Sequence, residues 1–245
     1  MVTKPEGAQL ARIALKKAAA PAQTRRRHAW IAAPEAEGAQ LATLLKGGGF
    51  DVQVSSDTST IHKGVADPKT DLLVMTDSCS EADLKAIAAG ARGQEHGSYM
   101  AILLYATGRI DTRTSAIMAY ALDTDALLSS RDTQQSFVST ARRLCVERAP
   151  LSRLGILPET LAHRIDDLCS RMDRLDYFDL LGVPRDVGRQ ALQARFHTIA
   201  LEIHPDRHSN LKHLHPPGFS RVRSLYKRMA EAYQVLSDEN ERQKY

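Results

Sequence analysis

A proline inside a short polar run separates two amphipathic segments near the end of this 245-residue chain. Pro205 lacks the N–H that a helix would use, so the first helix, over about 189–203, is predicted to end before it. A second helix is predicted over 220–236. Apolar residues recur in both at intervals of three and four: Leu192, Phe196, Ile199 and Ile203, then Val222, Tyr226, Met229, Tyr233 and Leu236. Two such stripes bury against each other, which predicts an antiparallel hairpin with His204, Pro205 and Asp206 at its exposed tip.

Two short helices are expected beside the hairpin. Residues 176–181 form the first, which Gly182 stops, and its Tyr177 and Leu181 are expected to close the hairpin core. Residues 237–245 form the second. The C-terminal part of the chain is therefore predicted to be an all-α domain.

Residues 176–245 resemble a J-domain, the module that defines DnaJ-type co-chaperones. The matching stretches, in order, are DYFDLLGV at 176–183, IAL at 199–201 before His-Pro-Asp, EAYQVLSD at 231–238 and RQKY at 242–245. The resemblance implies a domain that binds an ATP-loaded DnaK-type chaperone and stimulates its ATP hydrolysis through His204, Pro205 and Asp206. It does not cover the rest of the chain.

The resemblance also implies a basic second helix, and here the chain departs from the family pattern. The positions where Lys and Arg are usual carry Gln193, Ala194, His197, Thr198 and Glu202. This leaves Arg189, Arg195 and Arg207 as the positive charges expected to face the chaperone. Fewer charges should weaken electrostatic steering, which lowers the association rate more than it alters the bound geometry.

Short apolar runs alternate with helix-length segments over residues 28–149. Strands are predicted at 29–33, 50–54, 72–75, 100–105 and 126–128, and helices at 37–45, 60–66, 81–91, 112–120 and 133–147. Continuous apolar strands separated by helices are typical of a parallel sheet covered on both faces. Five strands in this length predict a flavodoxin-like α/β domain.

Two nucleotide-binding signals are missing from this domain. The turn after the first strand has no glycine to admit a pyrophosphate, and no Gly-x4-Gly-Lys-Ser/Thr run occurs. The domain is instead similar to a receiver domain in length, strand count and the apolar run that ends at Asp77. That resemblance implies a phosphorylatable Asp after the third strand, two acids after the first and a Lys after the fifth. The phosphorylatable position falls on Thr76, and Asp77 comes one residue later. The positions of the two acids fall near Ala32 and Ala33, and the position of the Lys falls on Ser129 or Ser130.

A receiver without these groups has little means of phosphoryl transfer. Paired carboxylates would be needed to hold a divalent cation. If no cation is bound, the charge that develops during phosphoryl transfer to Asp77 is not neutralised. We therefore expect a degenerate receiver that serves as an interaction module for a protein partner. An unrelated α/β fold and a working phospho-switch at Asp77 are the alternatives.

Charge and cysteine content limit the compartment and the partners. The net charge of +4 comes from residues 1–27, which hold seven Lys/Arg and one acid and are expected to be a basic flexible tail. Nucleic acid is not an expected partner, because no basic face is predicted on the folded part. Cys79, Cys145 and Cys169 are scattered, which favours a reducing, cytoplasmic location. Neither a membrane span of roughly 18 apolar residues nor a secretory signal is expected.

Residues 150–175 are expected to connect the two domains. Five apolar residues repeat there with a period of 3.5: Leu161, Ile165, Leu168, Met172 and Leu175. Two heptads are fewer than a coiled coil needs, so a helix packed on its own chain is expected, with homodimerisation as the alternative.

Together the segments predict a non-enzymatic co-chaperone in which a receiver-like module targets a J-domain. No cofactor is implied. A metal is not expected either, because the histidines at 204, 208, 213 and 215 have no acid or cysteine at ligand spacing and fall in or beside a polar, mobile loop at 207–218. The alternative function is a signalling adaptor, in which the receiver-like domain carries the output and the J-domain only docks.

Overall fold

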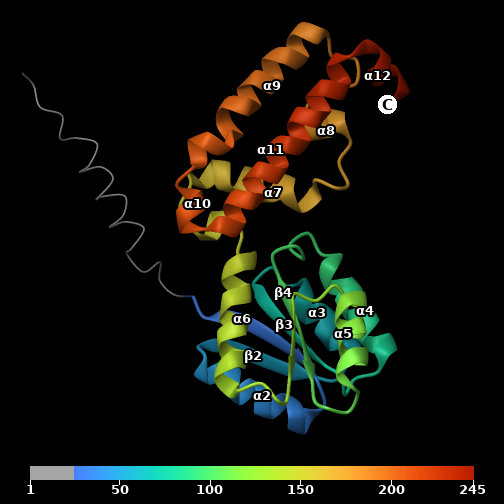
Figure 1. Cartoon of the computed structure of the whole chain (residues 1–245), viewed down its shortest axis with the longest axis vertical. Coiled ribbons are helices and arrows are strands. Elements are labelled where there is room, and N and C mark those ends of the chain that lie inside the picture. The colour runs from blue at the N-terminus through green and yellow to red at the C-terminus, as the bar shows by residue number, and fades with distance from the viewer. Residues whose placement is uncertain (1–24) are drawn as a thin grey trace, which may run out of the picture.

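The computed structural model describes residues 25–245, which form an α/β domain and a helical domain stacked along one long axis (Figure 1). Most of the predicted basic tail, residues 1–24, lies outside the described residues. Strand β1 (Arg27–Ala32) begins two residues before its predicted start at 29. Arg27 pairs with Phe50 of the neighbouring strand, and the Arg25 guanidinium donates to the Lys69 carbonyl. The prediction assigned these arginines to the tail because charge alone does not reveal sheet pairing.

The sheet has five parallel strands in the order β2-β1-β3-β4-β5. The other strands are β2 (Phe50–Ser55), β3 (Thr70–Thr76), β4 (Ala101–Ala106) and β5 (Ala126–Ser129). This is the doubly wound order of flavodoxin-like folds, with a crossover helix between successive strands. The predicted fold class of the N-terminal domain is confirmed.

Helices cover both faces of this sheet. One face carries α2 (Glu35–Gly47) and α6 (Gln134–Arg148); the other carries α3 (Thr58–Ala66), α4 (Glu81–Arg92) and α5 (Thr112–Ala121). Alternate residues of β3 therefore enter different cores: Leu72 and Val74 pack with α2 and α6, whereas Leu73 and Met75 pack with α3 and α4. Burial on both sides explains why this strand is an unbroken apolar run.

The helical domain follows a 3-10 turn, η1 (Leu151–Arg153). Its elements are α7 (Glu159–Arg171), α8 (Tyr177–Leu181), α9 (Arg189–Ile203), η2 (Pro205–His208), α10 (Leu211–Leu214), α11 (Pro216–Ser237) and α12 (Glu239–Lys244). The apolar stripes of α9 and α11 share one core, which Tyr177 and Leu181 of α8 help to close. The predicted antiparallel hairpin is confirmed.

Helix α11 is longer than the sequence indicated. It begins at Pro216, four residues before the predicted start at 220, because prolines fit the first helical turn, where their missing N–H has no role. Nδ1 of His215 accepts from the Gly218 N–H and caps the helix. The predicted mobile loop at 207–218 is therefore wrong: much of it is helical, and Leu211 is fully buried.

The apolar repeat at 161–175 is covered by the chain itself. Ile165 of α7 is buried in the core of the helical domain, and Leu161, Leu168, Met172 and Leu175 pack against that core. The repeat is therefore used within one chain instead of forming a free coiled-coil face. No helix within residues 25–245 combines the length and the apolar character that a membrane crossing requires.

The two domains meet where α6 ends. The Arg221 guanidinium donates to the carbonyls of Glu147 and Ala149 at 3.1 and 2.6 Å. The His215 ring donates through Nε2 to the Val146 carbonyl at 2.8 Å, since its Nδ1 is the acceptor at Gly218. The Val146 carbonyl also accepts from the Ala149 N–H at 3.2 Å. The bonds from Arg221 and His215 thus cap the end of α6, where carbonyl groups have no N–H four residues further along the helix. The helical domain thus sits at the amino ends of the strands.

Candidate functional site

The candidate site is the tip of the α9–α11 hairpin. Helix α9 closes with the His204 N–H bonded to the Ala200 carbonyl at 3.0 Å, and Pro205 then opens η2. Proline lacks an N–H and fixes its own φ, so the chain turns sharply at this point. The turn directs Asp206 outward, and its side chain is 91% exposed.

The imidazole of His204 holds the turn from inside. Its Nδ1 accepts from the Asp206 N–H at 3.3 Å, and its ring meets the Tyr226 ring edge-on, with centroids 4.8 Å apart. Tyr226 belongs to α11, so this contact joins the tip to the second helix of the hairpin. The ring is 40% exposed, far less than the neighbouring carboxylate. His204 therefore positions the loop, while Asp206 is the group presented to solvent.

A second histidine braces the other side of the tip. His208 is buried, and its Nε2 lies 2.7 Å from the Glu202 carbonyl in the last turn of α9. Glu202 in turn pairs with Arg164 of α7. His208 and His215 both contact backbone groups instead of each other, so they serve the fold of the tip. Periodicity could not reveal this, because both residues lie outside the apolar stripes.

The three arginines expected to face a chaperone lie in different surroundings. Arg189 is exposed at the start of α9, and Arg207 is exposed beside Asp206. Arg195 is half-buried, and its Nε donates to the Leu181 carbonyl at 2.9 Å. Gly182, which follows that carbonyl, adopts the left-handed conformation that ends α8. Arg195 thus helps to end α8. Arg207 is the one of these three arginines that lies next to the tip.

The outward side of α9 is aromatic and polar. The rings of Phe196 and Tyr233 stack with centroids 4.3 Å apart. They border a shallow hollow of about 590 Å³ that is also lined by Gln190, Gln193, Ala194 and His197. This is the stretch where basic residues are usual in the family that the sequence resembles, so contact here would depend on shape and stacking more than on charge.

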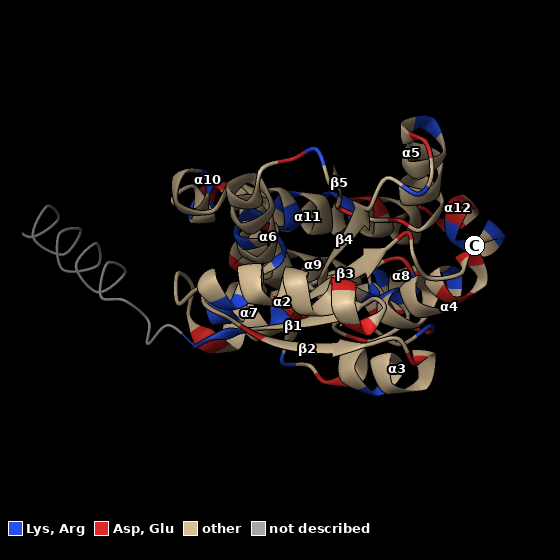
Figure 2. Cartoon of the chain, turned by 90° about the horizontal axis from the view of Figure 1, so that it is seen from below, with Lys and Arg blue, Asp and Glu red and all other residues tan. Residues whose placement is uncertain are grey.

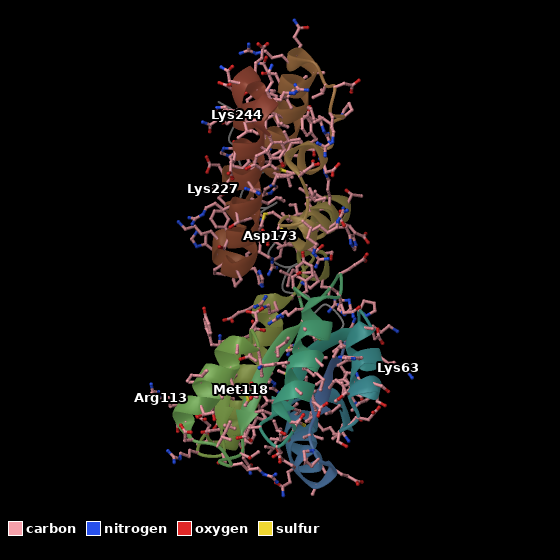
Figure 3. The ribbon with its side chains drawn as sticks, turned by 90° about the vertical axis from the view of Figure 1, so that its right-hand side faces the viewer. Lys63, Arg113, Met118, Asp173, Lys227 and Lys244 are labelled. Carbon is pink, nitrogen blue, oxygen red and sulfur yellow. The ribbon has the colours of Figure 1, made fainter. Side chains whose placement is uncertain are left out.

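Positive charge is found on α11 and α10, away from the arginines that the sequence predicted to face a chaperone. Lys212, Arg223 and Lys227 are exposed and form no ion pair with any residue in the described range 25–245. Figure 2 shows basic residues along α11, and Figure 3 labels Lys227 on the outer side of the helical domain. A count of Lys and Arg outside the apolar stripe of α11 could have found them.

The receiver-like site lies at the carboxyl edge of the sheet. Asp77 is buried; its Oδ1 accepts from the N–H and the hydroxyl of Thr107 at 2.8 and 2.6 Å, and its Oδ2 has no partner among the described residues. Ala32 and Ala33, which stand where a receiver has its acidic pair, are buried and apolar. Ser129, at the lysine position, bonds to Asp132.

One acid at this edge was missed by sequence reasoning. Glu37 of α2 accepts from the Ser78 hydroxyl at 2.6 Å, and its other oxygen is buried without a partner among the described residues. It lies four residues beyond Ala33, the last position at which the acidic pair was expected, on a helix that the fold brings next to Ser78. Glu37 and Asp77 therefore both place a carboxylate near Ser78 at this edge, in an arrangement that differs from the receiver pattern.

Comparisons with known proteins agree with this architecture. The family model of the DnaJ domain matches residues 176–245. The chaperone protein DnaJ of Wolinella succinogenes is 35% identical over 74 residues, which are 30% of this chain and 18% of that protein. DnaJ homolog subfamily B member 9 of Rattus norvegicus is 34% identical over 70 residues, 29% of this chain and 28% of that one. The chain thus spans about a fifth to a quarter of the length of these relatives.

Solved structures resemble the α/β domain at low identity. The receiver domain of sensor histidine kinase PA1611 from Pseudomonas aeruginosa is 11% identical, with a TM-score of 0.43 over 49% of this chain and 98% of that one. A sensor protein from Polaromonas sp. JS666 is 15% identical, with a TM-score of 0.44 over 51% and 100%. The fold itself is established by the strand order. The chain therefore carries a DnaJ domain at residues 176–245, joined to a receiver-like, five-stranded α/β domain.

Proposed function

We propose that this protein is a J-domain co-chaperone. Its DnaJ domain binds an ATP-loaded DnaK-type chaperone and stimulates ATP hydrolysis, and its α/β domain targets the complex to a protein partner. The observation that carries the proposal is the carboxylate of Asp206, 91% exposed on a tip braced by His204 and His208.

Each residue of the triplet has a physical role. An exposed carboxylate at Asp206 can accept charge-assisted hydrogen bonds from an arginine of the chaperone. Pro205 stiffens the tip, so docking loses less conformational entropy. His204 holds the loop through its contacts with the Asp206 N–H and Tyr226. Arg207 and Arg189 add favourable charge at the two ends of α9, whereas Arg195 supports the domain from within.

The hydrolysis chemistry belongs to the chaperone, so this chain acts as a non-enzymatic partner without a cofactor of its own. Burial raises the pKa of the Cys145 and Cys169 thiols to about 12, which keeps both protonated at neutral pH. The three cysteines are free, which supports a reducing, cytoplasmic location.

Single-turnover ATP hydrolysis by a bacterial DnaK tests the proposal. We expect the full chain to accelerate hydrolysis and Asp206→Asn to abolish the acceleration, because the amide loses the charge that an arginine would bind. Asp186→Asn is the matched control: Asp186 is exposed before α9, at the opposite end of the hairpin, and should retain full stimulation. Circular dichroism checks that both variants keep the helical fold. Equal stimulation by Asp206→Asn and the native chain would reject the co-chaperone role.

The second candidate is a signalling adaptor in which the DnaJ domain docks without stimulating. The polar and aromatic surface of α9 favours it, since Gln193 and His197 replace the basic residues usual in the family. Binding of DnaK without acceleration of its hydrolysis would support this function instead.

A further inference from the structure

A hollow of about 570 Å³ lies at the junction of the two domains, where α6 ends (Figure 1). Its walls come from α6 and the turn before β4 in the α/β domain, and from α7 and α11 in the helical domain. Sites for small molecules often form where two domains meet, with volumes of roughly 300–1,000 Å³. We call this feature the junction hollow; it is lined by Tyr99, Arg143, Arg148, Met172, Arg221 and Ser224, among others.

The charges that line the junction hollow do not balance. Arg143 pairs with Glu147 at 2.8 Å, and Arg148 pairs with Asp125. Both acids that line the hollow are therefore matched by an arginine that lines it too. Arg221 is the third arginine, and no ion pair ties it to an acid among residues 25–245. The lining thus has one positive charge without a counter-charge.

Arg221 is also incompletely bonded. Its two Nη groups donate to the carbonyls of Glu147 and Ala149, which are neutral acceptors. Its Nε is buried and has no acceptor among the described residues. Asp166 acts on the guanidinium through space, but its oxygens already accept from two backbone N–H groups of η1. Burial lowers the pKa of Arg221, because a guanidinium that leaves water without gaining a carboxylate is destabilised.

The rest of the lining suits the uncharged body of an organic molecule. Leu144 and Met172 provide apolar contact, and Tyr99 provides an aromatic ring. Ser224 comes three residues after Arg221, so the two lie on the same side of α11. The Ser224 hydroxyl can donate a hydrogen bond to an oxygen atom that enters the hollow. Sites of this kind are mostly apolar, with a few polar groups that fix the orientation of the ligand.

We infer that the junction hollow binds a small organic anion with one carboxylate and an apolar or aromatic body. The carboxylate would supply the counter-charge that Arg221 lacks and would accept from the Ser224 hydroxyl. The body would be covered by Leu144 and Met172. The inference goes beyond the co-chaperone proposal, since none of the lining residues belongs to the tip at 204–206.

A ligand in the junction hollow would contact both domains at once. It would therefore bind the docked arrangement of the domains better than a separated one, and its binding would favour the docked arrangement. A ligand that binds only the folded, docked chain also stabilises it by mass action. Benzoate, as a simple aromatic carboxylate, should thus raise the midpoint of thermal unfolding of the native chain.

Nuclear magnetic resonance of the isotope-labelled full chain tests the inference, with benzoate as the probe. The readout is the Nε–H signal of Arg221, which Arg221→Lys identifies by removing it. We expect benzoate to shift this signal until the site is saturated, and to bind more weakly at high salt. Benzamide has the same shape without the charge and should bind at least about tenfold more weakly. Acetate has the carboxylate without the ring and should also bind about tenfold more weakly.

Ser224→Glu removes the need for a ligand without removing Arg221. The new carboxylate lies three residues from Arg221 on an exposed position of α11, within reach of a helical ion pair. It supplies the counter-charge and repels the probe, so benzoate binding should weaken at least about tenfold. The midpoint of thermal unfolding of this variant should not respond to benzoate.

Gln234→Glu is the matched control. It adds the same charge at an exposed position of α11 outside the junction hollow, so it should bind benzoate as the native chain does. The backbone amide spectra check that both variants keep the fold. Neither measurement involves DnaK, so failure of this inference leaves the co-chaperone proposal untouched.

Four results would overturn the inference. The first is an Arg221 signal that benzoate leaves unmoved. The second is benzamide binding as tight as that of benzoate, which would show that no charge is recognised. The third is acetate binding as tight as that of benzoate, which would mean an adventitious ion only. The fourth is equal benzoate binding by Ser224→Glu and the native chain, which would place the probe elsewhere.

Discussion

At the scale of single residues, Arg195 and Arg207 carry the same charge in different surroundings. Nε of Arg195 donates to the Leu181 carbonyl at the end of α8, in a half-buried position. Arg207 is exposed next to Asp206, and no ion pair ties it to another residue within 25–245. The first should therefore stabilise the fold, and the second should act on the encounter with a chaperone.

Alanine substitutions separate these two roles. Arg195→Ala should lower the free energy of unfolding by about 1 kcal/mol, because the Leu181 carbonyl loses its donor. Arg207→Ala should change stability by less than about 0.5 kcal/mol and should slow association with DnaK instead. Chemical denaturation and stopped-flow binding measure the two effects. An unfolding free energy that is unchanged in Arg195→Ala would show that the hydrogen bond is not structural.

Asp77 is also defined by its immediate contacts. Thr107 occupies one carboxylate oxygen with two hydrogen bonds, and the other oxygen is buried. An attacking carboxylate must be free to reach a phosphoryl donor, so we expect no stable label at Asp77 after incubation with acetyl phosphate and Mg²⁺. Mass spectrometry of the intact chain measures this, with Asp77→Asn as the control. A phosphoryl adduct present in the native chain and lost in that variant would restore the phospho-switch.

At the scale of elements, side-chain caps determine where several helices begin. Asp57, Ser80, Asp111 and Thr133 each accept a backbone N–H in the first turn of the helix that follows. The cap of α3 is the most strongly bonded: Oδ2 of Asp57 accepts from the Thr60 N–H at 2.7 Å and from its hydroxyl at 2.6 Å. These bonds lower the pKa of Asp57 from 3.8 to about 2.

The Asp57 cap gives α3 a defined pH dependence. Because the folded pKa lies below the unfolded one, the charged cap stabilises α3 fully above pH 3.8, and this stabilisation is lost as the pH falls toward about 2. The chemical shift of the Thr60 amide proton should therefore change with a midpoint near pH 2. Asp57→Asn keeps a neutral cap, so its Thr60 signal should show no such change. A midpoint near 3.8 in the native chain would contradict the bonded cap.

At the scale of the whole molecule, the junction determines how the DnaJ domain is oriented. Arg221 bonds to two carbonyls at the end of α6, its guanidinium lies over the Tyr99 ring, and burial lowers its pKa. His215 adds a bond to Val146. The connecting 3-10 turn is also anchored, since Arg153 donates to the Pro68 carbonyl and pairs with Asp71. The two domains therefore form one continuous body.

Removing the Arg221 side chain should release this orientation. Arg221→Ala loses two hydrogen bonds from a charged donor, each of which typically contributes about 1.5–3 kcal/mol. We expect a larger radius of gyration in small-angle X-ray scattering and a separate, earlier unfolding transition for the less stable domain. Arg223→Ala, an exposed neighbour on α11, is the control and should scatter as the native chain does. Identical scattering from Arg221→Ala would mean that other contacts suffice to fix the domains.

Local patterns in the sequence were enough to predict the helices, the strands and the tip of the hairpin. The apolar spacing in α9 and α11, the unbroken run in β3 and the proline at 205 are properties of neighbouring residues, so they could be read without a structure. The hairpin, the parallel sheet and the exposure of Asp206 follow from them. The placement of Asp77 at the carboxyl edge follows in the same way, because it comes directly after a buried strand.

The polar side chains that are used inside the fold could be identified only from the way the helices and strands pack together. Arg195 was expected on a chaperone-facing surface but ends α8, and residues 207–218 were expected to be mobile but are braced by His208 and His215. His215 meets Val146, 69 residues away, and Glu37 meets Ser78, 41 residues away. A hydrogen bond between polar groups so far apart in the sequence produces no periodic sequence pattern, because it depends on how the helices and strands pack against each other.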